Sequence, residues 1–349
     1  MRYARIAGIG SALPERVVTN DELSTMVDTS DEWIYSRTGI RARRFAGTGE
    51  TAASLAAEAA TRALETAGTD PGSIDLTVVG TISGDQPMPS TAAFVQERLG
   101  LHGAAFDVSA ACAGFIYGTQ LASAQIATGG AETALVIGTE VLSRVLNFSD
   151  RTTCVLFGDG AGAAVLVPGE EPGVIGSVLE NDGRHARLLE IPAGGSREPA
   201  SAETVARGDH NIRMKDGREV FKRAVVGMAG ACARLLDKSG LTADDVALMV
   251  PHQANARIIR AVAERLSFPS ERVFVDLERV GNTSAASVPI ALDHAWQAGR
   301  LRPGDLVLTA AFGSGLAWGG PRRGRWPPTA IRWPAPTAPT TPAPRRPSG

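Results

Sequence analysis

Cys112 is the residue of this 349-residue sequence whose setting best suits covalent chemistry. It lies in AFDVSAACAGFIYG, between a strand-like run and a segment with helical spacing, so we expect it at the start of a helix. The unpaired N–H groups and positive dipole of a helix N-terminus favour a thiolate over a thiol, and therefore a nucleophile. Flanking alanines and Gly114 leave room for a substrate. From these features alone, a small buried packing residue is still the commoner role.

Two residues far along the chain offer polar chemistry. His252 ends the apolar run VALMVPHQ, and the carboxyl end of a strand in an α/β protein faces a crevice. Acid–base or hydrogen-bonding work suits that place, although a lone histidine is more often structural. Asn282, in VGNTSAAS, is either a helix cap or an amide donor to a carbonyl or enolate oxygen. The tight turn Gly313–Gly315 either supplies N–H groups to an oxyanion hole or is an ordinary turn.

Composition excludes several classes of protein. The net charge of -2 gives no reason to expect a nucleic-acid partner. No apolar run is long enough to span a membrane, and the N-terminus is too briefly apolar for a signal peptide. The cysteines lack CxxC spacing, so neither a disulfide framework nor a zinc site is indicated, and we interpret Cys154 and Cys232 as packing residues. We expect a cytoplasmic α/β protein.

The elements that position these residues follow from alternating apolar and alanine-rich segments. We predict buried strands over Ile74–Thr81, Thr133–Glu140, Val246–Gln253 and Asp305–Gly313, and helices over Thr51–Gly68 and Arg218–Gly240. This alternation predicts a layered α/β architecture with mixed sheets. Phe-Gly-x-Gly occurs in both Leu156–Val167 and Ala311–Gly320, which indicates a duplicated βαβ-containing unit with a site at the seam.

The C-terminus departs from this pattern. From Pro321 the chain is rich in proline and contains six arginines and no acidic residue. Such a segment cannot bury enough apolar surface to offset its ordering entropy, so we predict a disordered tail. The alternative is a basic or polyproline docking segment.

Taken together, six motifs resemble the β-ketoacyl-acyl-carrier-protein synthase III family, the initiating condensing enzymes of the thiolase-like fold. They run in the family's order and cover about residues 1 to 319: Thr29–Arg44 (TSDEWIYSRTGIRARR), Ala110–Phe115 (AACAGF), Phe157–Leu166 (FGDGAGAAVL), Val250–Ile259 (VPHQANARII), Gly281–Ser287 (GNTSAAS) and Ala311–Gly319 (AFGSGLAWG). The resemblance implies two duplicated halves, 1–168 with the nucleophile and 169–320 with the histidine and asparagine, in an α-β-α-β-α arrangement. Residues 321–349 then form a separate tail.

The resemblance also implies a reaction. Cys112 takes the acyl group of a short acyl-CoA, and malonyl-acyl-carrier protein then loses CO2 and condenses with it. His252 and Asn282 hydrogen-bond the malonyl thioester oxygen, and the backbone N–H groups of Cys112 and Ser314 form the oxyanion hole. Ser314 stands where the family often has glycine, so its side chain is expected to crowd the pocket. No cofactor or metal is expected, because the CoA thioester is a substrate.

Further positions match the family's binding sites. Trp33 and Arg151 match the pair that sandwiches the adenine of CoA, with Arg37 and Thr29 near the nucleotide. The pantetheine arm is expected to contact Gly217, Phe221, Ala254 and Asn255. Lys222 and Arg257 match basic positions that dock the acidic carrier protein. Met88 matches the residue that closes the acyl pocket across a homodimer interface, where a flexible thioether suits acetyl and branched four- or five-carbon starters.

Alternatives remain at this point. In the family, GLAWG leads into a final apolar strand, which Pro321 and the arginines replace here. Either the protein lacks that strand, which leaves a sheet edge open, or the reading frame shifts near Gly320. The same acyl-cysteine also suits starter priming or acyl transfer in polyketide and secondary metabolism. A third possibility is a catalytically inactive scaffold subunit.

Overall fold

The computed structural model describes residues 2–171, 173–318 and 330–332, in which strands and helices alternate. The strands are β1 (Tyr3–Ala12), β2 (Val17–Thr19), β3 (Ala42–Arg44), β4 (Leu76–Gly80), β5 (Ala104–Val108), β6 (Ala134–Glu140), β7 (Gly160–Gly169), β8 (Glu180–Asn181), β9 (Leu189–Glu190), β10 (Arg213–Met214), β11 (Leu248–Pro251), β12 (Leu306–Ala310), β13 (Phe312–Gly313), β14 (Ala317–Trp318) and β15 (Ala330–Arg332). The α-helices are α1 (Asn20–Ser24), α2 (Asp31–Thr38), α3 (Ala52–Ala67), α4 (Thr91–Leu99), α5 (Gly114–Thr128), α6 (Ala202–Ala206), α7 (Gly217–Ser239), α8 (Ala256–Arg265), α9 (Leu277–Val280) and α10 (Ser287–Gln297). Short 3-10 helices include η2 (Ala111–Ala113), η7 (Ser284–Ala286) and η8 (Ser314–Leu316).

The elements expected from the sequence are present. β4, β6, β11 and β12 lie inside the four apolar runs, and α3 and α7 fill the two expected helical segments. α3 begins where the Thr51 hydroxyl accepts from Ser54 N and ends at Gly68, whose φ of 62° suits a residue without a Cβ. α7 is capped by Asp216, the residue before it, whose side chain accepts from the N–H groups of Arg218 and Glu219.

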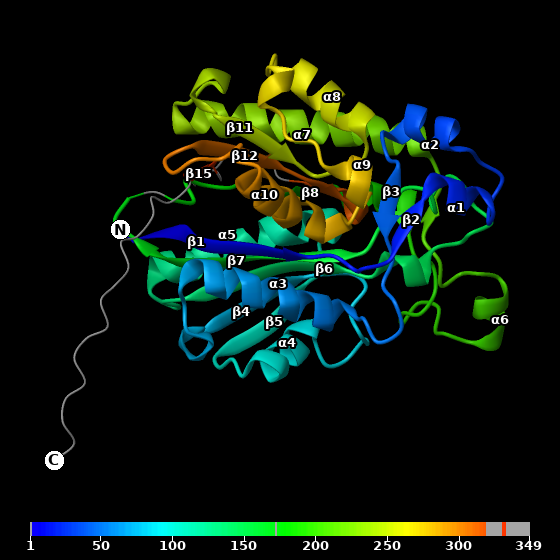
Figure 1. Cartoon of the computed structure of the whole chain (residues 1–349), viewed down its shortest axis with the longest axis horizontal. Helices are drawn as coiled ribbons and strands as arrows, with labels where there is room; N and C mark the ends of the chain where they lie inside the picture. Colours follow the sequence, from blue (N-terminus) through cyan, green and yellow to red (C-terminus); the bar gives the residue numbers. More distant parts are fainter. Residues whose placement is uncertain (1, 172, 319–329, 333–349) are drawn as a thin grey trace.

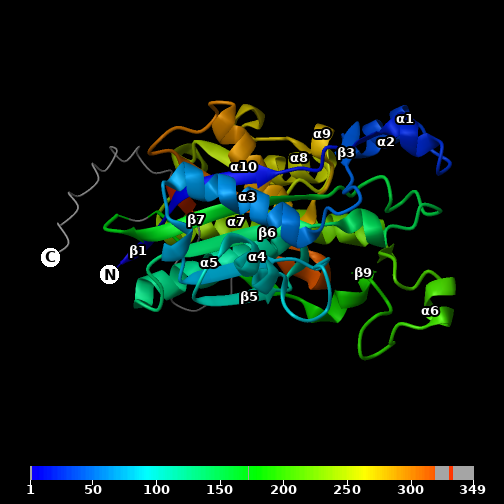
Figure 2. The ribbon, with the colours of Figure 1, turned by 60° about the horizontal axis from the view of Figure 1, so that its bottom comes forward.

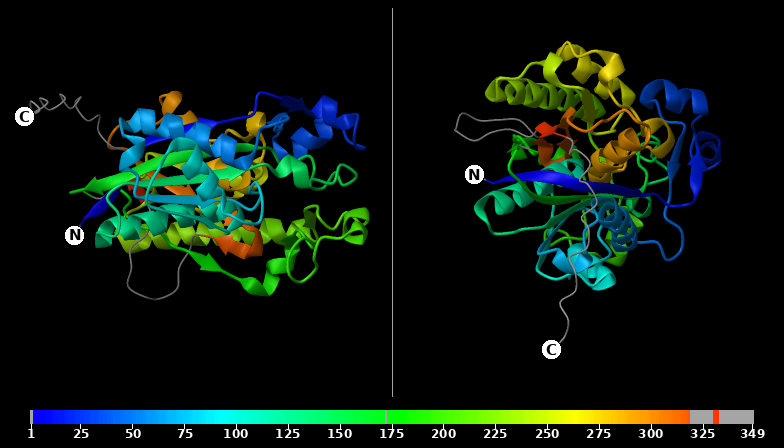
Figure 3. Two further views of the ribbon diagram at one scale, coloured as in Figure 1. Left: turned by 90° about the horizontal axis from the view of Figure 1, so that it is seen from below. Right: turned by 60° about the vertical axis from the view of Figure 1, so that its left-hand side comes forward.

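Five layers of structure stack on one another (Figure 1). One sheet has the order β1-β7-β6-β4-β5, and a second has the order β11-β12-β15. Helices α3 and α4 cover the outer face of the first sheet, which Figure 2 turns toward the reader. α5 and α10 lie between the sheets, and α7 and α8 cover the outer face of the second. The end-on view in Figure 3 shows α7 and α8 (yellow-green to yellow) on the side of the molecule opposite α4 (cyan). The expected α-β-α-β-α layering is therefore confirmed.

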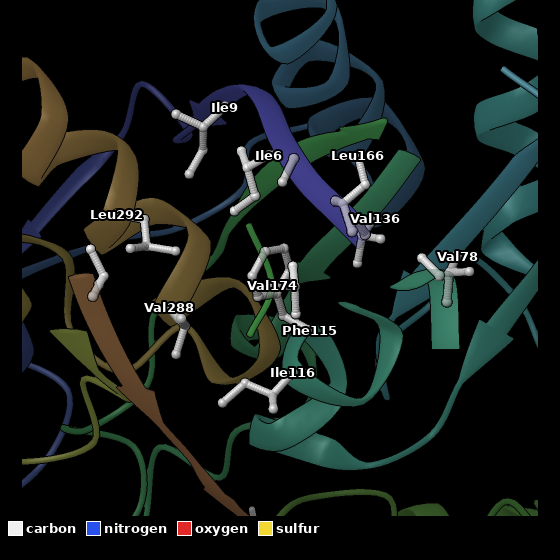
Figure 4. Packing of buried hydrophobic residues seen from close by; sticks show 14 of the residues in the cluster. Ile6, Ile9, Val78, Phe115, Ile116, Val136, Leu166, Val174, Val288 and Leu292 are labelled. Atoms are coloured by element: carbon white, nitrogen blue, oxygen red, sulfur yellow. The ribbon is translucent and has the colours of Figure 1, made fainter. Parts of the chain in front are cut away.

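The central helical layer is held by apolar side chains from both sheets. Figure 4 shows Ile6, Val136 and Leu166 of the first sheet beside Phe115 of α5 and Val288 of α10. Each of these residues is at most 2% exposed. Because burying one such side chain contributes roughly 1.5–3 kcal/mol, this core fixes α5 and α10 relative to each other. The N-terminal ends of these two helices carry the site.

β15 corrects one expectation for the tail. Ala330–Arg332 pair antiparallel with β12, so the edge of β12 is not open along that stretch. An unpaired strand edge presents free N–H and C=O groups, and a short extended segment satisfies them even when its surroundings are rich in proline. The rest of the expected disordered tail lies outside the described residues. None of the helices in the described part of the chain is both long enough and apolar enough to cross a membrane.

Candidate active site

Cys112 lies in η2, immediately before α5, as the sequence predicts. Two glycines allow this helix start to rest directly on β4, because a Cβ on Gly80 would lie 2.6 Å from the carbonyl carbon of Gly114. The preceding residue, Ala111, has a φ of 44°, a strained value for a residue with a side chain. Such strain persists only where the surroundings impose it, and here it turns Cys112 into a cavity.

Burial shifts the pKa of the Cys112 thiol in the direction opposite to that expected from the helix N-terminus. Burial raises the pKa of Cys112 to about 12, a hydrogen bond with Ser284 lowers it, and the charge of Glu140 raises it. The side chain is 7% exposed. The free thiol is therefore held as the neutral acid in the resting protein, and the helix N-terminus acts against that burial.

His252 enters the same cavity from the end of β11. Its backbone N–H donates to Ala310 O at 2.7 Å, which continues the parallel pairing of β11 with β12 by one residue. Burial alone lowers the pKa of His252 to about 3, so the ring is neutral. Nδ1 lies 2.5 Å from the hydroxyl of Ser287, whose oxygen also accepts from Gln253 N. When the Ser287 hydroxyl donates its hydrogen to Nδ1, the neutral ring carries its own proton on Nε2.

Asn282 uses both ends of its amide. Oδ1 accepts from Ser284 N at 2.9 Å, which is the local turn role expected of an asparagine before a helix. Its backbone is fixed because N donates to Leu156 O and O accepts from Gly158 N. With Oδ1 held in this way, the Nδ2 hydrogens are the part of the amide that faces the cavity. The cap and donor interpretations of Asn282 are therefore compatible.

The turn that contains Ser314 packs directly on the Cys112 segment. A Cβ on Gly313 would lie 2.5 Å from Ala110 O and 3.0 Å from Cys112 N, a contact that only glycine permits. Both segments border the cavity, so backbone N–H groups from each can serve one oxygen atom. The Ser314 hydroxyl donates to Leu189 O, which holds the side chain against the cavity wall at β9.

One cavity brings Cys112, His252 and Asn282 together, and its remaining wall is mainly apolar. Gly217, Phe221, Ala254 and Asn255, four expected pantetheine contacts, also line it. A second cavity opens to the surface and shares Leu156, Met214, Gly217, Phe221 and Asn255 with the first. The two form a channel that leads from the surface to the thiol.

Trp33, Arg37 and Arg151 line the outer end of this channel. The guanidinium carbons of Arg37 and Arg151 lie 4.5 Å and 4.9 Å from the centre of the Trp33 ring. Arg151 also donates to Asp28 O at 2.8 Å. A flat ring that stacks between Trp33 and Arg151 must therefore displace the arginine, which is exposed and able to move.

Basic residues surround the channel mouth. Arg257 lines it and lies over the Phe221 ring, whereas Lys222 is exposed on α7 outside the lining. The mouth also includes Lys215 and Arg218, which the sequence analysis did not single out. Arg218 could have been found from the sequence, because it precedes Lys222 by four residues and therefore lies on the same face of the helix.

Thr29 and Met88 lie apart from the cavity. Thr29 lines neither part of the channel, and its buried Oγ1 has no partner within the described residues. Met88 is 82% exposed, so within one subunit it closes no pocket.

The sequence analysis did not identify Ser287, Ser284 and Glu140. Ser287 contacts His252, and Ser284 contacts both Asn282 and Glu140. Serines and a glutamate carry no distinguishing pattern until the fold brings them together.

Comparisons with known proteins show which family profiles, relatives and solved structures this chain resembles. Two family profiles match the chain: 3-Oxoacyl-[acyl-carrier-protein (ACP)] synthase III over residues 106–183, and the C-terminal profile of the same name over residues 236–321. A beta-ketoacyl-[acyl-carrier-protein] synthase III of Symbiobacterium thermophilum is 52% identical over 335 residues, which cover 95% of this chain and 99% of the relative. The crystal structure of 3-oxoacyl-[acyl-carrier-protein] synthase III from Aquifex aeolicus VF5 matches with a TM-score of 0.84 and 43% identity, covering 95% of this chain and 100% of that one. A priming beta-ketosynthase from the R1128 polyketide biosynthetic pathway matches with a TM-score of 0.86 and 38% identity, covering 96% and 98%.

Proposed function

Because the chain belongs to the 3-oxoacyl-[acyl-carrier-protein] synthase III family, we propose that it joins a short acyl-CoA to malonyl-acyl-carrier protein by decarboxylative condensation. The observation that carries the proposal is the meeting of a cysteine, a neutral histidine and an asparagine amide at the closed end of one channel. The products are a 3-oxoacyl-carrier protein, CoA and CO2. No cofactor is needed, because loss of CO2 generates the carbon nucleophile.

The first step transfers the acyl group to the protein. The Cys112 sulfur attacks the thioester carbonyl, the bond from that carbonyl to the CoA sulfur breaks, and the thiol proton ends on CoA. The carbonyl oxygen gains negative charge as the tetrahedral intermediate forms. Backbone N–H groups of Cys112 and Ser314 are placed to stabilise it, since their segments pack together at the cavity.

The second step forms the new carbon–carbon bond. The malonyl thioester loses CO2, and the electron pair of the broken bond becomes an enolate. A neutral His252 with its proton on Nε2 and the Nδ2 group of Asn282 are two hydrogen-bond donors for the enolate oxygen. The enolate carbon attacks the acyl-Cys112 carbonyl, and the Cys112 sulfur leaves as a thiolate that takes a proton from solvent.

The residues around the channel mouth suit the two substrates, acyl-CoA and malonyl-acyl-carrier protein. Trp33 with Arg151 offers a stacking site for the adenine of CoA at the channel mouth. The positive side chains there, Arg37, Lys215, Arg218 and Arg257, suit the CoA phosphates and an acidic carrier protein. Lys222 extends the same basic surface along α7.

We also propose a homodimer that completes the acyl pocket. Met88 is 82% exposed, Ile82 38% and Phe106 39%, and Phe106 belongs to β5, the edge strand of the first sheet. An exposed edge strand with apolar side chains is a surface that a second copy can cover.

Sedimentation analysis tests whether the protein is a dimer in solution. Turnover of acetyl-CoA against isobutyryl-CoA tests the starter, and strict acetyl selectivity would contradict a pocket closed by Met88.

Incubation with radiolabelled acetyl-CoA tests the first step. The purified protein is expected to retain label after denaturation, and a Cys112→Ala variant is expected to retain none. Addition of malonyl-acyl-carrier protein should then move the label into 3-oxobutyryl-carrier protein. A chain that folds but never becomes labelled is a scaffold rather than an enzyme.

The second candidate is starter priming in a polyketide pathway, favoured by the 38% identity to the R1128 priming enzyme. The carrier protein distinguishes the two functions. Faster condensation on a polyketide carrier protein than on the fatty-acid carrier protein would support priming.

A further inference from the structure

Arg43 is a buried charged residue to which the proposed reaction assigns no role. It lies in β3, is 0% exposed, and is the largest of the fully buried side chains in the described part of the chain. Nη1 donates to Asn20 Oδ1 at 2.8 Å and to Val18 O at 3.2 Å, and Nη2 donates to Val155 O at 2.8 Å. None of these acceptors is a carboxylate, so within the described residues no ion pair offsets the cost of burying the guanidinium.

The acceptor Val155 O belongs to the segment that holds the backbone of Asn282. Leu156 O, in the next residue, accepts from Asn282 N at 2.9 Å, and Gly158 N donates to Asn282 O at 3.0 Å. Phe157, between them, forms an isolated parallel bridge with Asn282, and both residues line the cavity. Because these contacts join the two segments closely, a displacement of one displaces the Asn282 amide.

The stem of Arg43 packs on two glycines beside this bridge. A Cβ built on Gly158 or on Gly281 would lie 3.1 Å from Arg43 Cβ, so both backbones pass close to the arginine. Gly281 immediately precedes Asn282 and has a φ of 69°, a value that favours glycine. Arg43 thus supports Asn282 in two ways, through the hydrogen bond to Val155 O and through contact of its stem with these glycines.

The other nitrogen of the guanidinium is anchored in the hairpin formed by β2 and β3. Val18 lies opposite Arg43 in the pairing of these two strands. Asn20 is 1% exposed, and its Nδ2 donates to Ile40 O at 2.7 Å and to Asp31 Oδ1 at 2.8 Å. Both hydrogens of Nδ2 are then used, so Oδ1 is the end of the amide that faces Arg43. The guanidinium therefore joins this hairpin to the segment behind Asn282.

We propose that Arg43 is a positioning residue that fixes residues 155–158, and with them the Asn282 amide, at the place where the enolate oxygen forms. This role rests on the proposed function, in which Asn282 Nδ2 donates to that oxygen. The oxyanion donors for acylation are backbone N–H groups of Cys112 and Ser314, which belong to other segments. Arg43 therefore acts on condensation and not on acylation.

Arg43→Lys keeps the positive charge and most of the stem but changes the geometry of the donors. A guanidinium presents its N–H groups from a planar fork, whereas an ammonium presents three from a single nitrogen. Lysine cannot occupy the positions of both Nη1 and Nη2, so either Val155 O or Asn20 Oδ1 loses its donor. The segment behind Asn282 is then no longer tied to the hairpin.

The two half-reactions, each measured in a single turnover after saturation with acetyl-CoA, test this role. Arg43→Lys is expected to slow formation of 3-oxobutyryl-carrier protein by roughly 10- to 100-fold, because misplacement of a reacting group by about 1 Å costs up to about 100-fold. Labelling of Cys112 should change by less than about twofold, since its oxyanion donors are not displaced. Equal losses in both steps would overturn the proposal.

Arg44→Lys is the matched control. It is the same substitution at the next residue of β3, but the Arg44 guanidinium donates to Pro14 O and Glu15 O, each at 3.2 Å, and not to the segment behind Asn282. It should leave both half-reactions near those of the wild type. A loss of condensation as large as that in Arg43→Lys would mean that any weakening of β3 has this effect, and would overturn the specific role of Arg43.

Double mutants separate the positioning of Asn282 from a general loosening of the site. In an Asn282→Ala background, Arg43→Lys should lose most of its effect on condensation, because no amide remains to be positioned. In a His252→Ala background the effect should persist, since His252 is held by β11 and Ser287. An effect of the same size in both backgrounds would indicate general loosening and would overturn the proposal.

A readout that needs no activity keeps this role separate from the proposed function. The backbone N–H groups of Gly158 and Asn282 are hydrogen-bonded and lie in buried residues. Hydrogen–deuterium exchange of the peptides that contain them should be faster in Arg43→Lys and unchanged in Arg44→Lys. Unchanged exchange in Arg43→Lys would overturn the proposal. A wild-type protein that forms no product would refute the proposed function and leave the exchange result intact.

A second variant replaces Arg43→Lys if circular dichroism shows that it does not fold. Arg43→Gln is neutral, so it buries no charge without its partners, and it is too short to donate to Val155 O from the position of Nη2. It should show the same split, with slower condensation and little change in acylation. Condensation at the wild-type rate in a folded Arg43→Gln protein would count against the proposal.

Discussion

At the residue scale, His252 and Asn282 are built as donors rather than as bases. Burial without a charged partner lowers the pKa of His252 to about 3, and the Ser287 hydroxyl occupies its Nδ1. The Asn282 carbonyl is likewise occupied by Ser284 N–H. The free end of Asn282 is its Nδ2 group, which can only donate, and the free end of His252 is Nε2, which donates when the Ser287 hydroxyl donates to Nδ1. Such donors stabilise an enolate but do not remove the thiol proton from Cys112 efficiently.

Because these two side chains are proposed to act on the enolate, variants of either should slow condensation without slowing acylation to the same extent. His252→Ala and Asn282→Ala are each expected to slow condensation with malonyl-carrier protein by about 100- to 1000-fold, the usual effect of removing one oxyanion donor. Acylation of Cys112 by acetyl-CoA should change far less, because its oxyanion donors are backbone groups. Burst labelling measures acylation, and carrier-protein product measures condensation. Equal losses in both steps would contradict the assignment.

At the element scale, the site depends on loops that touch without side chains between them. β13 and η2 lie far apart in the chain, and Gly313 lets the first lie against the backbone of the second. η7 reaches the same place through the strained Ser284. The strain at Ala111 and Ser284 is found beside the proposed nucleophile and the proposed donor, where fixed geometry matters most.

Gly313→Ala tests this contact. The added Cβ would lie 2.5 Å from Ala110 O, so one of the two backbones must move. Because misplacement by about 1 Å can cost 100-fold in rate, both half-reactions should slow by about that factor while the fold is retained. Gly183→Ala, where a Cβ meets open space, is the control. Circular dichroism with acetyl labelling checks the result, and full acylation activity in Gly313→Ala would show that the contact is not needed.

At the scale of the whole molecule, burial of titratable groups in the site makes the free energy of unfolding depend on pH. His252 has a lower pKa folded than unfolded, so below about pH 6.5 the unfolded chain binds a proton that the folded chain does not. The stability contributed by a neutral His252 is thus present above the unfolded pKa and is lost as the pH falls toward 3. Glu140 and Asp159, whose pKa values are raised by burial, act in the opposite direction.

The acid dependence is therefore best measured as a difference between variants. Between pH 6 and pH 4, the free energy of unfolding of the wild type should fall relative to that of His252→Asn by up to about 1.4 kcal/mol per pH unit, the value for one proton. Urea unfolding at several pH values measures it. Parallel curves for the two proteins would show that His252 titrates alike in the folded and unfolded states.

The sequence by itself determined the type of fold and the candidates for the reacting groups. Apolar runs and helix caps are local, so β4, β6, α3 and α7 could be predicted from neighbouring residues alone. Cys112, His252 and Asn282 could be named as candidates because each follows a strand or precedes a helix in a motif. Their roles, and the division into halves 1–168 and 169–320, stay predictions that the experiments above address.

The tertiary structure alone decided the state of each group. Whether Cys112 is a thiol, which tautomer His252 adopts and where the Ser314 hydroxyl points all depend on contacts with Ser284, Ser287 and Leu189. It also placed Ala330–Arg332 beside β12, where composition indicated disorder. The physical reason is the same in each case. Burial and hydrogen-bond partners come from residues far apart in the chain, and only packing brings them within a few ångströms of one another.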